Sequence, residues 1–221
     1  NTIGGINNDF LLSIKETTDG GFILGGSSNS NISGDKTENC LGDEDYWIVK
    51  TDSLGNIQWQ NTIGGSQRDV MLNIQQTFDS GYIVGGRSNS TISGDKIENC
   101  YGDWDYWIIK TDSTGNIQWQ NTIGGSSFDN LSSIKQTVDG GYILGGWSSS
   151  SISGNKTENC LGLVDNWVVK IDFSGNILWQ NTIGGSSDDY LNTINLTANG
   201  DYILGGYSNS NKSENKDENS L

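Results

Sequence analysis

The sequence predicts an all-β fold, a β-propeller built from four-stranded antiparallel blades. Three observations predict it: a repeat of 60 residues, four strand-like segments in each repeat, and two segments that are apolar on both faces. The pentapeptide Asn-Thr-Ile-Gly-Gly begins at Asn1, Asn61, Asn121 and Asn181, without insertions or deletions between copies. Such a period is typical of stacked supersecondary units. We therefore expect residues 1–221 to form one array of about 3.7 repeats, namely 1–60, 61–120, 121–180 and the partial 181–221.

The first two strands of each repeat are expected to form a hairpin. The first strand covers Leu11 to Thr17, and the second begins at Phe22 and ends in the pair Gly25-Gly26. Asp19-Gly20-Gly21 stands between them, and Asp-Gly between apolar runs is a strong hairpin signal. Consecutive apolar residues in the second strand indicate burial on both faces. The paired glycines indicate that another backbone approaches closely.

The third and fourth strands complete the expected blade. Tyr46 to Lys50 is again apolar on both faces, whereas Ile57 to Ile63 alternates between apolar and polar residues. Alternation is typical of a half-exposed strand. This combination favours a sheet sandwiched between like sheets over separate β-sandwiches or a β-helix. Lys50 and Asp52, which recur in each complete copy, are expected to form an ion pair or to cap the turn.

The repeat also resembles that of a known group of proteins. Its strings Asp-Gly-Gly-Tyr-Ile-Leu-Gly-Gly, Asp-Tyr-Trp-Ile-Ile-Lys-Thr-Asp and Gly-Asn-Ile-Gln-Trp-Gln-Asn-Thr-Ile-Gly-Gly-Ser are similar to the repeats of certain secreted bacterial β-propellers. Those proteins usually carry a C-terminal sorting domain for type IX secretion. The resemblance covers the whole chain and implies a propeller fold with export to the cell surface or medium. It implies little about function, and the sorting domain itself is not part of this sequence.

Composition and charge exclude several classes of function. The chain carries a formal charge of −15, which opposes binding to nucleic acid or to an anionic membrane surface. It has no run of 18 apolar residues that could span a bilayer. It has no histidine, so Ser-His and Cys-His mechanisms are impossible on this chain. The carboxylates repeat with the blades, whereas active sites break symmetry. We therefore expect a protein that is not an enzyme.

The number of strands does not complete a ring. The fourth repeat is expected to contain the first two strands but not the last two. Either the natural protein continues, or the open edge is completed by a neighbouring chain. An unpaired strand edge is a template for such pairing. Head-to-tail self-association of this kind produces rings or filaments.

The expected ligand-binding region is the long segment from Ser27 to Glu44 between the second and third strands, together with its copies. Loops of this length are often functional. One position differs sharply among otherwise faithful copies, and its residues are Ser27, Arg87, Trp147 and Tyr207. Arginine and aromatic residues are typical of binding hot spots, and aromatic rings stack on sugars. Drift at an exposed position is the alternative explanation.

Acidic residues at the end of the same segment suggest a metal site. They are Asp43, Asp45, Asp103, Asp105 and Asp165. Asp-x-Asp spacing in a glycine-flanked loop can ligate Ca²⁺, although a full site needs six to eight oxygen atoms. Alternatively, Asp45, Asp105 and Asp165 accept backbone hydrogen bonds where the third strand begins.

One cysteine recurs in each complete repeat, at Cys40, Cys100 and Cys160. They are expected to be free or partly buried thiols, with intermolecular bridges or a soft-metal ring as alternatives. Taken together, the sequence favours a secreted or cell-surface binding or adhesion module that engages a glycan or a surface protein. The alternative is a structural protein that assembles head-to-tail into fibres or layers.

Overall fold

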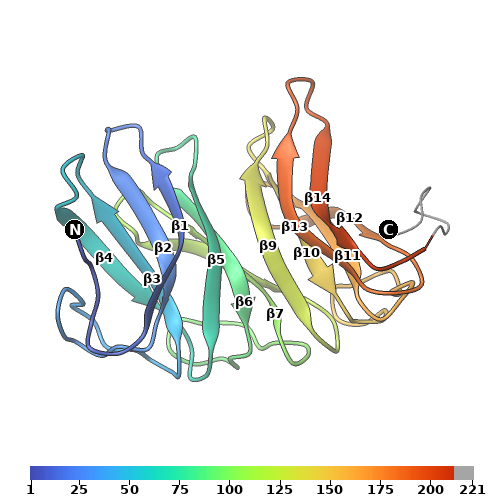
Figure 1. Ribbon diagram of the computed structural model, residues 1–221, viewed down its shortest axis with the longest axis horizontal. Coiled ribbons are helices and arrows are strands. Elements are labelled where there is room, and N and C mark those ends of the chain that lie inside the picture. The colour runs from blue at the N-terminus through green and yellow to red at the C-terminus, as the bar shows by residue number, and fades with distance from the viewer. Residues whose placement is uncertain (212–221) are drawn as a thin grey trace. The chain divides into compact units, whose positions relative to one another are not determined.

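The chain forms an all-β fold, as predicted. The computed structural model describes residues 1–211, which contain strands and turns but no helix, and therefore no helix able to cross a membrane (Figure 1). Ser220, which stands where the other repeats have cysteine, lies outside the described residues. The strands are β1 (Asp9–Glu16), β2 (Phe22–Ser28), β3 (Asp45–Thr51), β4 (Ile57–Ile63), β5 (Asp69–Gln76), β6 (Tyr82–Ser88), β7 (Asp105–Thr111), β8 (Ile117–Ile123), β9 (Asp129–Gln136), β10 (Tyr142–Ser148), β11 (Asp165–Ile171), β12 (Ile177–Ile183), β13 (Asp189–Leu196) and β14 (Tyr202–Ser208).

Each repeat folds into one antiparallel sheet whose strands pair in chain order. The first three sheets have four strands each, β1-β2-β3-β4, β5-β6-β7-β8 and β9-β10-β11-β12, and β13 pairs with β14. This is the strand order of a propeller blade. The chain divides into two compact units, the first comprising Asn1–Cys100 with Trp107–Thr122, the second Tyr101–Tyr106 with Ile123–Leu221.

The hairpin turn between β1 and β2 is fixed by Asp19. Its Oδ1 accepts hydrogen bonds from the Thr17 hydroxyl at 2.5 Å and the Gly21 amide at 3.1 Å. Gly20 has a φ of +79°, a conformation that costs glycine little. The buried ammonium group of Lys50 lies 3.0 Å from Asp19. The ion pair expected between Lys50 and Asp52 is therefore formed with Asp19 instead, while Asp52 accepts the amides of Leu54 and Asn56 and caps its own turn.

Strand boundaries differ from the prediction at one place that matters for the site. The fourth strand, Ile57–Ile63, is confirmed, but β1 begins at Asp9 and β2 continues to Ser28. Backbone pairing of Asp9 with Ser28 extends the ladder beyond the apolar run. The segment expected to be a loop from Ser27 onward thus begins two residues inside a strand, because pairing rather than hydrophobicity sets the end of β2.

Packing between successive sheets explains the paired glycines. In the first unit, a Cβ on Gly25 would lie 2.6 Å from Met71 Sδ and 2.9 Å from Ile74 Cγ2. A Cβ on Gly26 would lie 1.7 Å from the carbonyl oxygen of Phe10 on β1. Met71 and Ile74 are fully buried against the preceding sheet, and in the second unit Leu191 and Ile194 likewise cover Gly145. The predicted close approach of another backbone is confirmed at Gly26, whereas Gly25 is approached by side chains instead.

Aromatic residues and buried lysines complete the interior. Tyr46 of β3 packs on Trp107 with ring centroids 5.0 Å apart, and its hydroxyl donates to the Trp107 carbonyl oxygen at 3.1 Å. Lys36 is 1% exposed, lies over the Trp47 ring and donates to the Thr62 hydroxyl. Burial lowers the pKa of Lys36. Cation–π contact and the hydroxyl acceptor compensate part of the cost of burying an ammonium group.

Candidate functional site

The repeat position that varies between copies lies on the second strand of each sheet, not in a loop. Ser27 is fully buried on β2 and accepts a hydrogen bond from the Met71 amide at 3.1 Å. Arg87 is partly buried on β6, and burial, with Arg68 nearby, lowers its pKa. Trp147 is partly buried on β10, and Tyr207 on β14 is 55% exposed. Ser27 is therefore a packing residue. Of the four residues at this repeat position, Trp147 and Tyr207 are the two that the structure brings toward one surface.

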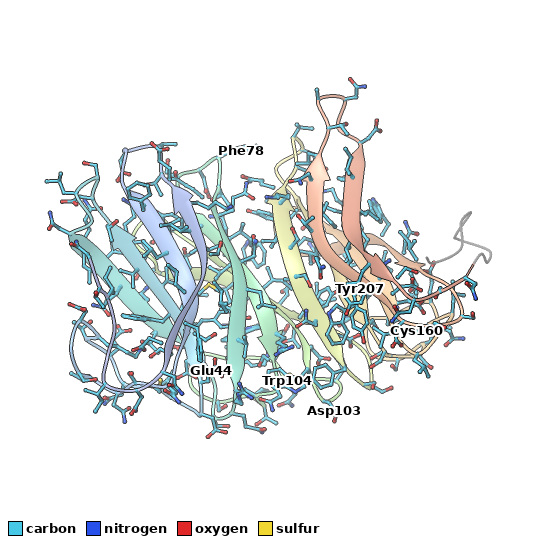
Figure 2. All side chains as sticks on the ribbon, in the orientation of Figure 1. Glu44, Phe78, Asp103, Trp104, Cys160 and Tyr207 are labelled. Carbon is cyan, nitrogen blue, oxygen red and sulfur yellow. The ribbon has the colours of Figure 1, made fainter. Side chains whose placement is uncertain are left out.

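Trp147 and Tyr207 belong to a row of five aromatic rings in the second unit, which we call the aromatic row. Its members in order of contact are Trp104, Phe128, Trp147, Tyr190 and Tyr207. Figure 2 labels the two end members, Trp104 and Tyr207. Successive ring centroids are 5.8, 5.9, 5.3 and 4.9 Å apart. Three contacts are stacked and that of Trp147 with Tyr190 is edge-on, both favourable aromatic geometries. None of the five rings is fully buried.

Strand pairing holds the aromatic row in place. Trp104 lies in the connection before β7, where it forms a parallel bridge with Phe128, and its carbonyl oxygen accepts the Asp129 amide at 2.7 Å. Tyr190 on β13 is the direct partner of Tyr207 on β14. Rings anchored to paired backbone lose little freedom when a ligand binds, which favours affinity. Sequence reasoning found Trp147 and Tyr207 by their variation but missed Trp104, Phe128 and Tyr190.

The positions of the aromatic row carry charges in the first unit. Glu44 and Arg68 occupy the repeat positions of Trp104 and Phe128 and form the corresponding parallel bridge. The Arg68 guanidinium binds the Glu44 carboxylate at 2.6 Å. Arg87 stands at the repeat position of Trp147. Nearly identical backbones thus present an ion pair in one unit and stacked rings in the other.

A pocket of about 190 Å³ opens at the Tyr207 end of the aromatic row. It is lined by Asn166, Tyr190, Leu191, Leu204, Gly206, Tyr207 and Ser208. Asn166 is half-buried, and its Oδ1 is shielded from solvent without a hydrogen-bond partner among the described residues. Burial raises the pKa of Tyr190, and Asp188 and Tyr207 add to the effect. The pocket therefore combines two aromatic faces, an amide and a negative electrostatic environment.

The carboxylates expected to bind metal do not form a common site. Asp45 is fully buried, and its Oδ2 accepts the amides of Leu41 at 2.5 Å and Gly42 at 3.3 Å. Asp165 holds its loop in the same way, and Asp105 accepts the Tyr101 amide. Asp43 and Asp103, in contrast, are exposed. Within residues 1–211, no three acidic or cysteine side chains group as metal ligands. The contacts of Asp45, Asp105 and Asp165 fit the alternative role, in which these carboxylates accept backbone hydrogen bonds where the third strand begins. Calcium binding stays a prediction.

The buried aspartates are electrostatically unusual. Burial raises the pKa of Asp45 to about 6, and the nearby Asp69 adds to the effect, while the backbone amides oppose it. Burial also raises the pKa of Asp69, although the Ser88 and Ser90 hydroxyls and the Gly65 amide oppose the shift. A Cβ on Gly64 would lie 2.0 Å from Asp45 Oδ1, so the Gly-Gly pair of the pentapeptide that begins the next repeat makes room for this carboxylate.

The cysteines are free thiols that donate to backbone. Cys40, Cys100 and Cys160 are half-buried, and each Sγ lies 2.9–3.0 Å from the carbonyl oxygen of the serine that ends the second strand. Burial, with Asp45 beside it, raises the pKa of Cys40 to about 11. The structure thus agrees with the expectation of partly buried free thiols.

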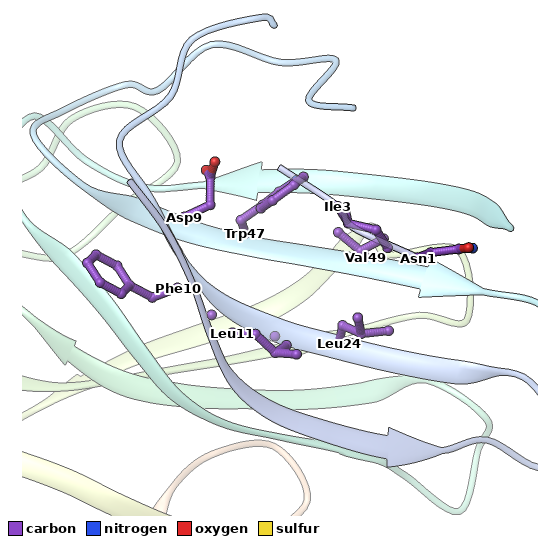
Figure 3. A pocket seen from close by; sticks show the side chains of 10 residues that line it. Asn1, Ile3, Asp9, Phe10, Leu11, Leu24, Trp47 and Val49 are labelled. Carbon is purple, nitrogen blue, oxygen red and sulfur yellow. The ribbon is translucent and has the colours of Figure 1, made fainter. Parts of the chain in front are cut away.

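The first sheet carries a second hollow, of about 270 Å³ (Figure 3). Figure 3 shows Ile3 beside Trp47 and Val49, and Phe10, Leu11 and Leu24 complete the apolar part of the lining. Leu11 is 58% and Ile14 51% exposed on this face, whereas their counterparts Met71 and Ile74 are fully buried. Trp107 of the second sheet, the counterpart of Trp47, packs against the ring of Tyr46 from the first sheet.

The sequence matches no protein-family model and no curated protein. Among solved structures, the chain is similar to a protein of unknown function from Bacteroides caccae, with a TM-score of 0.44 and 11% identity. The match covers 88% of this chain and 52% of that protein, so this chain spans about half of its length. The resemblance to secreted propellers with a type IX sorting domain stays a prediction.

Proposed function

We propose that this protein is a non-catalytic binding module, displayed at the cell surface or secreted, that binds carbohydrate on the aromatic row. The observation that carries the proposal is the row itself: five adjacent rings, none fully buried, anchored on paired strands. Pyranose rings present flat arrays of C–H groups that pack on aromatic faces. Tryptophan and tyrosine are also the residues that most often dominate binding energy.

Symmetry supports a ligand at this place. The repeats keep their framework residues with little change, whereas the row positions change from Glu44, Arg68 and Arg87 to rings. Packing demands are the same at equivalent places in a repeat, so packing alone does not require the difference. The net charge of −15 favours an uncharged ligand over nucleic acid or another polyanion.

A glycan array with Trp147→Ala tests the proposal. Removal of the Trp147 ring is expected to weaken glycan binding at least tenfold, because the sugar loses the central aromatic surface on which it packs. Phe173→Ala is the matched control, since Phe173 is 70% exposed in a turn outside the row. Binding that is absent from the array, or that survives Trp147→Ala unchanged, contradicts the proposal.

A second candidate is a structural role through head-to-tail assembly, favoured by the open face of the first sheet. Leu11 and Ile14 are exposed where Met71 and Ile74 are buried against a preceding sheet. Among residues 1–211, a Cβ on Gly205 of β14 would meet only Thr193, at 3.0 Å, whereas Gly25 and Gly145 are covered by side chains from the first strand of the next sheet. We infer that the first sheet of one copy can pack on β13 and β14 of another. Light scattering over a concentration series tests this head-to-tail assembly. A protein that stays monomeric at high concentration excludes it. If the protein does assemble, Leu11→Ser should reduce the size of the assemblies.

A further inference from the structure

The two arginines of this chain lie beside each other in the first unit. The sequence contains arginine only at positions 68 and 87, and acidic residues outnumber basic residues by 27 to 12. Arg87 on β6 is the direct strand partner of Val70, and Arg68 stands two residues before Val70. The pairing continues past the start of β5, because the Asn89 amide donates to the Arg68 carbonyl oxygen at 3.2 Å. Arg68 and Arg87 are therefore diagonal neighbours, which lie about 7–8 Å apart in a sheet, within reach of long side chains.

Glu44 holds one of the two guanidinium groups in a fixed orientation. Its Oε2 accepts hydrogen bonds from Arg68 Nε at 3.1 Å and from Arg68 Nη2 at 2.6 Å. Both bonds use the same edge of the planar guanidinium group, so the Nη1 edge faces away from this carboxylate. The side chain of Glu44 is 11% exposed, whereas that of Arg68 is 52% exposed. A dissolved ligand can therefore reach Arg68 while Glu44 anchors it.

Glu44 balances only one of the two positive charges. Burial lowers the pKa of Arg87, the positive charge of Arg68 lowers it further, and Glu44 opposes the shift. Two guanidinium groups beside one carboxylate leave one positive charge in excess, on a chain whose net charge is −15. At physiological ionic strength, exposed charges more than about 8 Å apart are largely screened from each other. The local excess therefore acts on a small ligand more strongly than the net charge does, and it favours an anion.

The repeat indicates which kind of anion fits this place. The three charged residues stand at the repeat positions of rings in the aromatic row, Glu44 for Trp104, Arg68 for Phe128 and Arg87 for Trp147. Arginine binds carboxylates through two parallel N–H···O bonds, a geometry that lysine cannot match. The acidic counterpart of the sugar proposed for the row is a sugar that carries a carboxylate, such as a uronic acid. The net charge of the chain disfavours a polyanion, so a single carboxylate is the better match.

We propose that Arg68 and Arg87 form a second carbohydrate subsite, in the first unit, that binds the carboxylate of an acidic sugar. The inference rests on the carbohydrate-binding function proposed above for its class of ligand, but its residues are separate from the aromatic row. Arg68, anchored by Glu44, presents an edge of its guanidinium group to the carboxylate. Arg87 supplies the positive charge that Glu44 leaves unbalanced.

The test is an NMR titration of the full chain with methyl glycosides of glucuronic and galacturonic acid, and of glucose and galactose. Because the chain has two arginines, its spectrum contains two arginine Nε–Hε signals, and Arg87→Ser assigns them. Both signals are expected to shift with a uronide and to stay in place with the neutral parent sugar. The uronide affinity measured at these signals should fall as salt is raised from about 20 mM to about 300 mM.

Variants at position 87 separate charge from geometry. Arg87→Ser introduces the residue that Ser27 provides at the equivalent place of the first repeat, so the sheet should fold unchanged. It is expected to weaken uronide binding, followed at the Arg68 signal, about tenfold. Arg87→Lys keeps the charge without the planar fork and should recover only part of that affinity. Lys15→Ser is the matched control, because it removes one positive charge from an exposed position on β1, and no change is expected.

The outcomes separate this inference from the proposed function. Arginine signals that do not respond to uronides, or equal uronide affinity in Arg87→Ser and the unaltered protein, overturn the inference, whatever Trp147→Ala does to neutral glycans. Acetate that binds at these signals as tightly as the uronides also overturns it, because the site then recognises a carboxylate without the sugar. Uronide binding that is lost in Arg87→Ser and kept in Trp147→Ala supports it. If uronides bind at the arginines while no neutral glycan binds the aromatic row, the row fails and the arginine subsite stands.

Discussion

Replacing Asp45 with asparagine should remove a pH-dependent loss of stability that the buried carboxylate imposes. Asp45 is fully buried, and its pKa is raised from 3.8 to about 6, chiefly by burial and further by Asp69. The unfolded chain releases this proton at lower pH than the folded chain does. Between about pH 3.8 and 6 the folded state therefore binds more protons, and its stability falls as the pH rises.

The size of the effect follows from the shift. Each pKa unit corresponds to about 1.4 kcal/mol, so a shift of roughly two units removes about 3 kcal/mol between pH 4 and pH 7. Asparagine keeps an oxygen that can accept the Leu41 and Gly42 amides, which now bind Asp45 Oδ2. It also removes the like charge near Asp69, so the variant should lose less stability than the unaltered protein over this range. Cys40 and Lys36 are the other ionisable groups beside Asp45.

Urea unfolding at pH 4 and pH 7 measures the difference, and carbon-detected NMR of the carboxyl groups measures the pKa of Asp45 directly. Asp19→Asn serves as a control of opposite sign. Hydrogen bonds from Thr17, Lys50 and Gly21 lower the pKa of Asp19, so its contribution is present at neutral pH and is lost as the pH falls. Identical pH profiles for Asp45→Asn and the unaltered protein, or a carboxyl titration near pH 4, would refute the reasoning.

Two further predictions concern packing and the thiols. Met71→Ala should destabilise the protein by about 3 kcal/mol, because Met71 is fully buried over Gly25. Leu11→Ala, at the counterpart that is 58% exposed, should lower the free energy of unfolding by less than about 1 kcal/mol. Equal losses of stability in urea unfolding would show that Leu11 is covered. Cys40 should react slowly with a thiol reagent at pH 8, because its pKa is raised to about 11, and denaturant should restore the rate; rapid reaction in the folded state would contradict the burial of its sulfur.

Local sequence patterns predicted most of the fold because the same strand patterns recur in successive repeats. The turn Asp19-Gly20-Gly21 and the alternating strand Ile57–Ile63 lie where the sequence places them. Pattern fails at the end of β2, where Ser27 and Ser28 are polar yet buried. Their hydroxyls satisfy partners, the Met71 amide and the Asp9 carboxylate, that come from another strand. Long-range hydrogen bonds of this kind leave no periodic signal in the segment itself.

The candidate site was only half visible in the sequence for a related reason. Variation at one repeat position marked Trp147 and Tyr207, but Trp104, Phe128 and Tyr190 occupy other positions and join the row only through strand pairing. For the acidic residues, the sequence instead suggested a common site that the structure does not assemble. Asp45 and Asp43 are close in sequence, yet one is buried and binds its own loop while the other is exposed. Their proximity along the chain suggested a shared metal site, but the fold places the two carboxylates in different environments.

Departures from repetition are the strongest functional signal in a chain of this kind. Framework contacts recur from repeat to repeat, as in the ion pairs of Lys50, Lys110 and Lys170 with the hairpin aspartates. A contact that recurs in each repeat stabilises the array and needs no ligand to explain it. The aromatic row breaks that rule, because the positions of Trp104, Phe128 and Trp147 carry Glu44, Arg68 and Arg87 in the first unit. Restoring the first unit's residue with Trp147→Arg should therefore keep the protein folded, because Arg87 already stands at the equivalent position, and weaken glycan binding by removing the central ring of the row. A variant that folds and still binds sugar with unchanged affinity would place the ligand away from the row.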